Sequence, residues 1–528
     1  MGLLVGFLLS SGDVTDGLEG ADTRIKREEL VMAKRGKQNL GGRFVFRPND
    51  IFLFAIGSCC VAGLSVSAAF APWLCSWLIL TLAFLVAWIV SLRLSRDPLG
   101  PLFLISGYCF LGIGVRGIAV YEGWAVNRFN APIGDDGLVV EVFLAGALAL
   151  ISCTLGYAGS AGGTLSRKWQ DWNWPTASWN PRIVNAYGVL SLGLGLASLY
   201  LLRSQFGDVV GFGTSPSIIA SRVSKGGISS TEMLAFFPLF SVLLMWGRKE
   251  LGSPGRLILL GNIGLVGAWF IIAGRKSLLF ETIFGLFLLR HYLRKRLGGR
   301  VLVVLLVPML ILISVAFYWK AYGFRVHSIE EQYSSQSTAN AVLDPLIERS
   351  YDFDSAIMIL QKTRSINDYR LGSTFEDLLW FYVPRQLWPE KPVSFGFSFA
   401  SEFLPGANLT ESYTPSMVGE LYLDFGFLGI IFGFYFLGVL IRALHEALPG
   451  KSALSTVVYI LVIFRLVNMI EGPITTHLEL LLGELLPVIL FALVHKMLDL
   501  SRGRIGQPSS TQGGLASFSA KTQAIRPF

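Results

Sequence analysis

Long uninterrupted runs of apolar residues restrict this chain more than any other feature of its sequence. Several runs reach about 18 residues or more without a helical or strand-like alternation of polar positions, which is enough to cross a hydrocarbon core of about 30 Å as a helix. Of the 528 residues, 52% are hydrophobic and 15% are charged, whereas soluble domains carry about 25% charged residues. We therefore predict an all-α polytopic membrane protein and disfavour the alternative, a large soluble core.

About twelve membrane-spanning helices can be drawn, with one long polar loop between the ninth and the tenth. The predicted organisation is a disordered tail (1–50), spans one to nine (51–320), the long loop (321–415), spans ten to twelve (416–497) and a second disordered tail (498–528). The predicted spans are 51–70, 72–92, 101–121, 138–159, 183–202, 232–246, 257–274, 277–289, 301–319, 417–443, 453–470 and 481–496.

The distribution of Lys and Arg predicts the orientation of these spans. If the N-terminal tail is cytoplasmic, 28 of the 44 Lys and Arg residues fall in cytoplasmic segments, most of them short. Because cytoplasmic loops carry an excess of these cations, we predict that both termini are cytoplasmic and that the long loop is external. The net charge of +8 then marks membrane topology, and no nucleic-acid partner is implied.

Cysteines and motifs exclude several kinds of site. All five cysteines lie within predicted spans, and none belongs to a pair or a Cys/His cluster with zinc-site spacing, so we predict neither a disulfide nor a metal site. The sequence contains no phosphate-binding glycine loop, dinucleotide-binding motif or catalytic serine motif with a supporting context. Energy for any reaction would have to come from an activated substrate outside the cell or from a gradient.

The long loop alternates cations with aromatic residues, including Arg349, Arg385, Lys391 and Trp388. Aromatic rings stack on sugars, and Arg side chains grip phosphate oxygens in pairs. The segment from Val383 to Pro392 holds three prolines, which would display Arg385, Trp388 and Lys391 on a stiff backbone able to bracket a diphosphate. The alternative is a solvated loop whose aromatic residues sit at the membrane interface.

Charged residues also occur at the external ends of predicted spans or inside them. Arg275 and Lys276 form a tight turn between two spans, where they would either bind an anionic headgroup or extend to the interface. Arg465 lies inside its span, where a charge is costly and usually functional. Asp352 and Asp354, in the long loop, are candidates for a base or for metal ligands, although such a pair is more often simply solvated.

The span after the loop begins with a second group of candidates. Glu420 and Asp424 are four residues apart and would share one helix face near the outer surface. Partial burial would make Glu420 a candidate general base, with His477 in a short external loop as the second candidate. Gly429 and Gly433 form a GxxxG pair that we assign to helix packing.

Several of these motifs together resemble the oligosaccharide repeat unit polymerases of the Wzy type. The resemblance covers Gly274-Arg275-Lys276-Ser277 between spans, Pro384-Arg385-Gln386-Leu387-Trp388-Pro389-Glu390-Lys391-Pro392 in the loop, and Gly419-Glu420-Leu421-Tyr422 before a glycine-rich span. Arg385 and Gly396 are separated by ten residues, as in the Arg-x10-Gly pattern of such polymerases. Only one match to that pattern occurs in an outer loop, so a two-site capture scheme has no support.

This resemblance implies polymerisation of repeat units carried on undecaprenyl diphosphate, at the periplasmic face of a bacterial inner membrane, in O-antigen or exopolysaccharide biosynthesis. It implies no bound cofactor, a lipid-linked oligosaccharide substrate, and a chain-length regulator and a flippase as partners. Arg275, Lys276, Arg349, Arg385, Lys391 and Arg465 would bind the diphosphate, Trp388 would stack on sugar, and Glu420 or His477 would accept the acceptor proton. The alternatives are an O-antigen ligase and, outside the enzymes, a polysaccharide flippase or transporter.

Overall fold

The computed structural model describes most of the chain between residues 71 and 505. The described residues are 71–95, 97, 99–124, 136–170, 181–206, 230–248, 251–273, 276–294, 296–297, 352–364, 368–380, 383, 388, 390, 395–403 and 415–505. The chain divides into two compact units, Met1–Val66 and Ser67–Phe528, and all described residues lie in the second. Two predicted spans, 51–70 and 301–319, lie outside the described residues.

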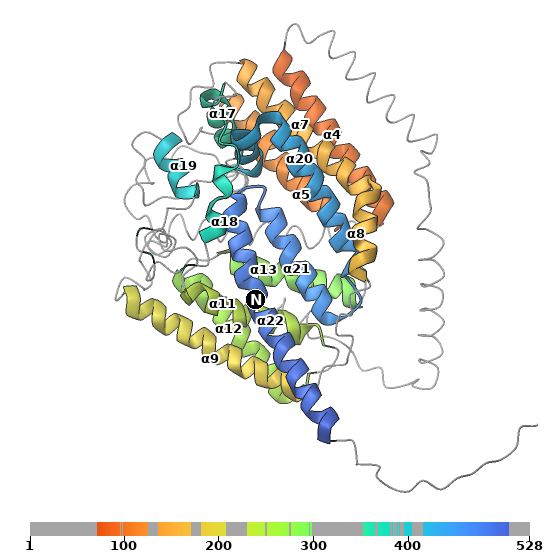
Figure 1. Cartoon of the computed structure of the whole chain (residues 1–528), viewed down its shortest axis with the longest axis vertical. Helices are drawn as coiled ribbons and strands as arrows, with labels where there is room; N and C mark the ends of the chain where they lie inside the picture. The colour runs from red at the N-terminus through yellow and green to blue at the C-terminus, as the bar shows by residue number, and fades with distance from the viewer. Residues whose placement is uncertain are drawn as a thin grey trace, which may run out of the picture. The chain divides into compact units, whose positions relative to one another are not determined.

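Every regular element among the described residues is a helix (Figure 1). Pro72, Pro101 and Pro181 each open a helix, at the position where the missing N–H of proline costs nothing. The elements are α4 (Pro72–Ser95), α5 (Pro101–Cys109), the π-helix η1 (Phe110–Val115), α6 (Arg116–Tyr121), α7 (Asp136–Ala158), α8 (Ser160–Gln170), α9 (Pro181–Phe206), α11 (Ser230–Trp246), α12 (Ser253–Ala273), α13 (Lys276–Leu289), the π-helix η3 (Arg290–Arg294), α17 (Asp352–Lys362), the 3-10 helix η5 (Ser373–Phe375), α18 (Asp377–Trp380), α19 (Phe395–Phe403), α20 (Met417–Ala447), α21 (Ala453–Asn468) and α22 (Ile474–Ile505).

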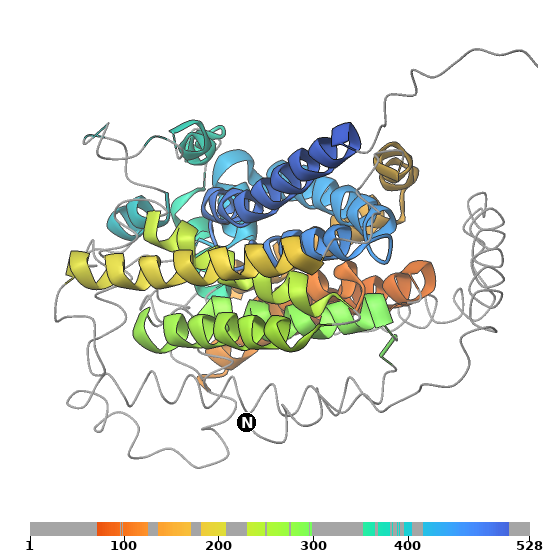
Figure 2. The same cartoon turned by 90° about the horizontal axis from the view of Figure 1, so that it is seen from below.

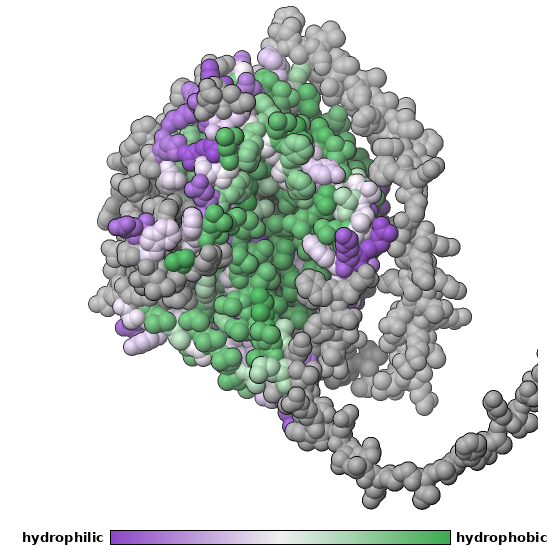
Figure 3. Space-filling model, viewed as in Figure 1, coloured by the Kyte–Doolittle hydropathy of each residue, from purple (hydrophilic) through white to green (hydrophobic). Residues whose placement is uncertain are grey.

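Six of these helical segments are long and apolar enough to cross a membrane, which supports a helical membrane protein. Hydrophobic residues cover the middle of the visible face, and hydrophilic residues gather near α17–α19 and near α8 (Figure 3). The six segments are Pro72–Ser95, Pro101–Tyr121, Asp136–Ala158, Pro181–Ser204, Met417–Ala447 and Ile474–His495; Met233–Trp246 and Ala453–Asn468 are shorter apolar helices.

The helices form two groups that α21 and α22 join (Figures 1 and 2). In one group, α4, α5, α7, α8 and α20 pack together; in the other, α9, α11, α12 and α13 do so. Helix α21 contacts α5 and α20 of the first group as well as α11 and α13 of the second. The sequence-distant helices α7 and α20 form the most extensive contact between described elements.

The crossing of α7 and α20 depends on two glycines. A Cβ atom added at Gly156 of α7 would lie under 3.0 Å from the carbonyl oxygen of Tyr435, and one added at Gly438 of α20 would lie as close to the carbonyl oxygen of Cys153. Real Cβ atoms do not approach this closely, so each glycine lets the other backbone come into direct contact. Small residues at a helix crossing are the usual basis of close helix packing in membranes.

Helix α20 is broken near its beginning, whereas the sequence predicts one continuous span. Gly426 has φ 63° and ψ −151°, a conformation that only glycine adopts without strain. The first part of the helix folds back, so that Leu421 lies against Gly429 and Gly433. The GxxxG pair therefore packs against its own helix. The portion from residue 427 to residue 447, at about 1.5 Å per residue, matches a hydrocarbon core of about 30 Å.

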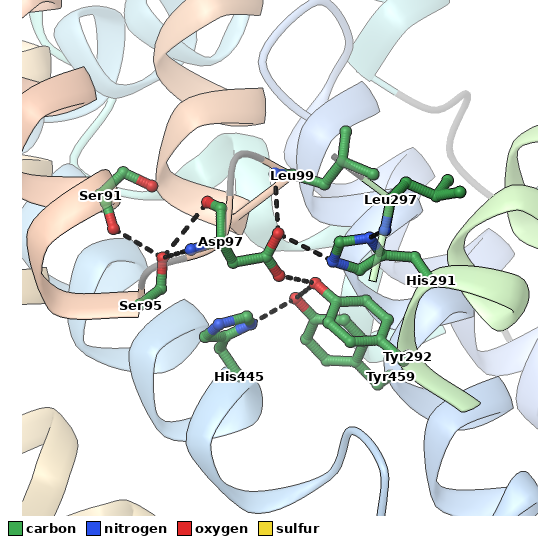
Figure 4. Close-up of polar contacts among 9 residues, drawn as sticks. All are labelled: Ser91, Ser95, Asp97, Leu99, His291, Tyr292, Leu297, His445 and Tyr459. Atoms are coloured by element: carbon green, nitrogen blue, oxygen red, sulfur yellow. Dashed lines mark hydrogen bonds and ion pairs between the residues drawn. The ribbon is translucent and has the colours of Figure 1, made fainter. Parts of the chain in front are cut away.

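The two ends of the bundle carry separate polar groups. We call the end that contains Glu420 the Glu420 end, and the end that contains the C-terminal part of α20 the His445 end. At the His445 end, Asp97 lies between α4 and α5 and is almost fully buried. Its carboxylate accepts hydrogen bonds from the backbone N–H of Leu99 (2.8 Å) and the hydroxyl of Tyr292 (2.8 Å), and it pairs with Nε2 of His291 (3.0 Å) (Figure 4).

The same polar cluster continues into α20 and α21. Nδ1 of His291 accepts from the backbone N–H of Leu297 (2.9 Å), and its other ring nitrogen, Nε2, is the one that faces Asp97. Nδ1 of His445 lies 2.8 Å from the hydroxyl of Tyr459 (Figure 4). Burial alone would raise the pKa of Asp97, but its hydrogen bonds, the one with His291 above all, lower that pKa to about 2. Asp97 therefore stays ionised and joins the α4–α5 link to η3, and Tyr292 continues the cluster to Tyr459 of α21.

Candidate functional site

Glu420 connects the folded-back start of α20 to the link between α21 and α22. Its side chain is completely buried, and Oε2 accepts a hydrogen bond of 2.7 Å from the backbone N–H of Ile474, the first residue of α22. The backbone N–H of Met417 donates to the carbonyl oxygen of Ile470 (2.9 Å), and the hydroxyl of Ser416 caps α20. A carboxyl oxygen that accepts from a backbone N–H at a helix N-terminus caps that helix, so Glu420 fixes the start of α22 against the start of α20.

The helix α17 brings acidic residues of the long loop into the bundle. All its residues from Asp352 to Leu360 are buried, and it packs against η1, α6, α7 and α20. Asp354 forms an ion pair of 2.8 Å with Arg116 of α6, and both side chains are 0% exposed. The expectation that Asp352 and Asp354 are solvated is therefore wrong, because α17 is inserted between spans.

A third carboxylate lies at the same end of the bundle. Glu471, in the link between α21 and α22, accepts a short hydrogen bond from the hydroxyl of Tyr108 in α5. Ile470 in this link and Ile474, which directly follows it, are the residues whose backbone groups bind the start of α20. Carboxylates from the loop, from α20 and from the α21–α22 link thus meet at the Glu420 end.

The segment 369–375, which we call the strap, attaches the long loop to the break in α20. Asp424 accepts hydrogen bonds from the backbone N–H of Gly372 (3.1 Å) and from the hydroxyl of Thr374. The backbone N–H groups of Arg370 and Leu371 donate to the carbonyl oxygens of Leu423 (3.0 Å) and Asp424 (3.1 Å). Asp424 therefore positions the strap.

Two described cations of the long loop, Lys362 and Arg370, bind to α19. The ammonium group of Lys362 donates to the carbonyl oxygens of Glu402 (2.9 Å) and Phe403 (3.2 Å), at the C-terminal end of that helix. The guanidinium of Arg370 pairs with the carboxylate of Glu402 and lies 5.2 Å from the ring centre of Phe395. These contacts join α17, the strap and α19.

Trp388, the predicted sugar-stacking residue, packs edge-on against Trp380. Their ring centres are 5.6 Å apart and their planes are at 90°. Trp380 ends α18, which contacts α22 and η5. The strap, α18 and both tryptophans therefore belong to one contiguous set of described residues beside α20 and α22.

Most of the predicted anion-binding cations cannot be placed. Arg275, Arg349, Arg385 and Lys391 lie outside the described residues. Lys276 is the first residue of α13, but its side chain lies outside them as well. Their predicted contact with a diphosphate stays a prediction.

Arg465 is held by two carboxylates that the sequence analysis did not single out. Its guanidinium lies 2.6 Å from Oε1 of Glu281 in α13 and 2.6 Å from Oε1 of Glu484 in α22, and all three residues are buried. A guanidinium between two carboxylates is a weak ligand for a further anion, because the nearby negative charges oppose it. Acidic residues inside apolar runs were the signal that could have revealed Glu281 and Glu484.

His477 lies in the first turn of α22, against Gly472. Its backbone N–H donates to the carbonyl oxygen of Pro473 (3.2 Å), and Nδ1 is buried without a hydrogen-bond partner among the described residues. It is therefore part of a helix start, not of the short external loop that the sequence predicts. Glu484 follows seven residues later on the same helix face.

No protein-family model, curated protein or solved structure matches the chain. Within the described part of the chain, no group of three or more His, Cys, Asp or Glu side chains could hold a metal ion.

Proposed function

We propose that this protein polymerises oligosaccharide repeat units carried on undecaprenyl diphosphate, at the periplasmic face of a bacterial inner membrane. The proposal includes about twelve spans, cytoplasmic termini and an external loop between spans nine and ten. Its support is the motif resemblance between Gly274 and Gly433 and the asymmetry of Lys and Arg between alternate connections.

One structural observation supports the proposal most strongly. The long loop is built into the Glu420 end of the bundle: α17 is buried between spans, and the strap is hydrogen-bonded to Asp424. This gathers buried carboxylates and a tryptophan pair at one end. An enzyme that joins sugars needs acid–base groups beside an aromatic surface, and a loop anchored in this way presents both on a rigid support.

The reaction assigned to this site is a glycosyl transfer. A hydroxyl oxygen of the incoming unit attacks the anomeric carbon of the growing chain, and the bond from that carbon to the diphosphate oxygen breaks. The lipid diphosphate leaves with the electron pair, and the hydroxyl proton passes to Glu420 or, as the alternative, to His477. Arg275, Lys276, Arg349, Arg385 and Lys391 would stabilise the leaving charge, whereas Arg465 is left out of this anion site because Glu281 and Glu484 hold it.

Replacing Glu420 with glutamine tests the assignment of the base. We expect Glu420→Gln to lower the polymerisation rate by about 10²- to 10⁴-fold, because the amide keeps an oxygen for the Ile474 N–H but accepts no proton. The measurement is the ladder of polymer lengths made by cells that carry the variant, at matched amounts of folded protein.

Glu446→Gln is the matched control, because Glu446 lies in the same helix α20 but in a partly exposed pair with Arg442 (2.8 Å) at the His445 end. The control should make a normal ladder. A full-length ladder from Glu420→Gln would rule out Glu420 as the base.

A transporter is the second candidate, and the cluster of Glu281, Arg465 and Glu484 favours it. These residues bring charges from three helices together inside the membrane region, as a polar pathway for a substrate or ion would require. A strain that lacks the protein separates the candidates. Single repeat units on the lipid core indicate a polymerase, lipid-linked polymer indicates a ligase, and absence of periplasmic units indicates a transporter.

A further inference from the structure

The carboxyl group of Asp352 occupies an unusual position at the start of α17. The residue is 1% exposed, and neither carboxyl oxygen has a hydrogen-bond partner among the described residues. Oδ2 lies where a Cβ atom would stand if Gly112 carried a side chain. The carboxyl group therefore fills a notch in the surface of a membrane-spanning segment.

The notch lies in an irregular part of that segment. Gly112 belongs to η1, the π-helical stretch between α5 and α6, and is itself buried. Short π-helical stretches inside α-helices occur frequently at functional sites. Here the wider turn and the absent side chain together make room for a group from the long loop.

The charges near Asp352 oppose its ionisation. Among the described residues, the negative charges of Glu471 and Asp354 act on it. The guanidinium of Arg116 forms an ion pair with Asp354, and the hydroxyl of Tyr108 donates a hydrogen bond to Glu471. Burial of an ionised carboxylate in this position would be unfavourable, because neither solvent nor a hydrogen bond from the described residues would stabilise its charge.

The neighbouring elements add few other titratable groups. Helix α5 adds the thiol of Cys109, α7 presents the ring of Phe143 to α17, and α20 presents Gly419 to it, beside the buried Glu420. Burial, with the charges of Glu471 and Asp354, raises the pKa of Asp352 well above its usual value.

We propose that Asp352 is a buried proton-binding site, in which the neutral carboxyl group inserted beside Gly112 locks the loop helix α17 into the bundle. Loss of the proton to solvent leaves a carboxylate that must regain water, and the first turn of α17 then leaves the notch. This inference goes beyond the proposed function, because it concerns how the loop is attached and needs no substrate for its test.

The sign of the pH effect follows from the proton count. In the unfolded chain Asp352 loses its proton near pH 3.9, whereas in the folded protein it keeps the proton to higher pH. The stabilising contribution is therefore fully present below about pH 3.9 and is lost as the pH rises towards the folded pKa. Over that interval the unfolding equilibrium constant increases up to about tenfold per pH unit.

The experiment compares the purified full-length protein with Asp352→Asn in lipid nanodiscs. We expect the wild type to show the infrared C=O band of a neutral buried carboxyl group and Asp352→Asn to lack it. Relative to the intrinsic exchange rate at each pH, hydrogen exchange of residues 352–360 should accelerate in the wild type as the pH rises towards the folded pKa of Asp352, and it should stay slower in the variant. Asp136→Asn, an exposed residue hydrogen-bonded to Tyr121 (3.0 Å), should behave as the wild type.

A second pair of variants tests the notch itself. Gly112→Ala fills the space that the carboxyl group occupies and should remove or shift the infrared band, whereas Gly107→Ala in the adjoining α5 meets no atom closer than 4.0 Å and should not. An unchanged band in Asp352→Asn, or the same pH dependence of exchange in both proteins, would overturn the proposal.

Discussion

Replacement of Arg116 with methionine is expected to destabilise the protein by about 3–5 kcal/mol, the usual cost of removing one partner of a buried ion pair. Arg116 and Asp354 are both completely buried and lie 2.8 Å apart. Without the guanidinium, the completely buried Asp354 carboxylate would lose the cation that pairs with it. The measurement is equilibrium unfolding in detergent micelles at neutral pH.

The double variant Arg116→Met/Asp354→Leu provides the control. Apolar replacement of a whole buried ion pair is often close to neutral, so the double variant should regain most of the stability that the single variant loses. If Arg116→Met unfolds at the same denaturant concentration as the wild type, the ion pair is not what holds α17 in the bundle.

Alanine at Gly438 is expected to destabilise the protein, and the sign of this effect is informative. In an exposed helix position, Gly→Ala usually stabilises by up to about 1 kcal/mol through helix propensity. At Gly438 the new methyl group would meet the carbonyl oxygen of Cys153, so α7 and α20 must move apart. We expect a net loss of about 1–3 kcal/mol, as for other overpacked positions.

Gly193→Ala, in the middle of α9, is the matched control because a Cβ atom there meets nothing within 4 Å. The control should be neutral or slightly stabilising in the same unfolding measurement. Equal effects of the two substitutions would contradict direct backbone contact between α7 and α20.

Apolar length was sufficient to predict where the helices lie, because crossing the bilayer depends on a run of residues that the sequence displays. The predicted spans 72–92, 101–121 and 138–159 correspond to described helices. The break at Gly426 was not predictable in the same way. A glycine inside a glycine-rich apolar run has many possible roles, and only packing of Leu421 against Gly429 and Gly433 selects this one.

The candidate site was harder to predict, because the roles of its polar residues depend on partners that are distant in sequence. Asp354 belongs to a polar loop, which suggests solvent, yet its partner Arg116 lies 238 positions away. Arg465 was correctly recognised as a buried charge but not as a partner of Glu281 and Glu484. The sequence shows that a charged residue lies within an apolar run, whereas only the fold shows which residue of opposite charge pairs with it.

The proposed function requires that this chain join lipid-linked repeat units without another enzyme. The direct measurement uses purified full-length protein in liposomes, supplied only with undecaprenyl-diphosphate-linked oligosaccharide, and separates the products by gel electrophoresis. We predict a ladder spaced by one repeat unit that forms without nucleotide and is lost in Glu420→Gln. If the substrate stays as single units although the wild-type protein is folded and the substrate is accessible, the proposed polymerase function is wrong.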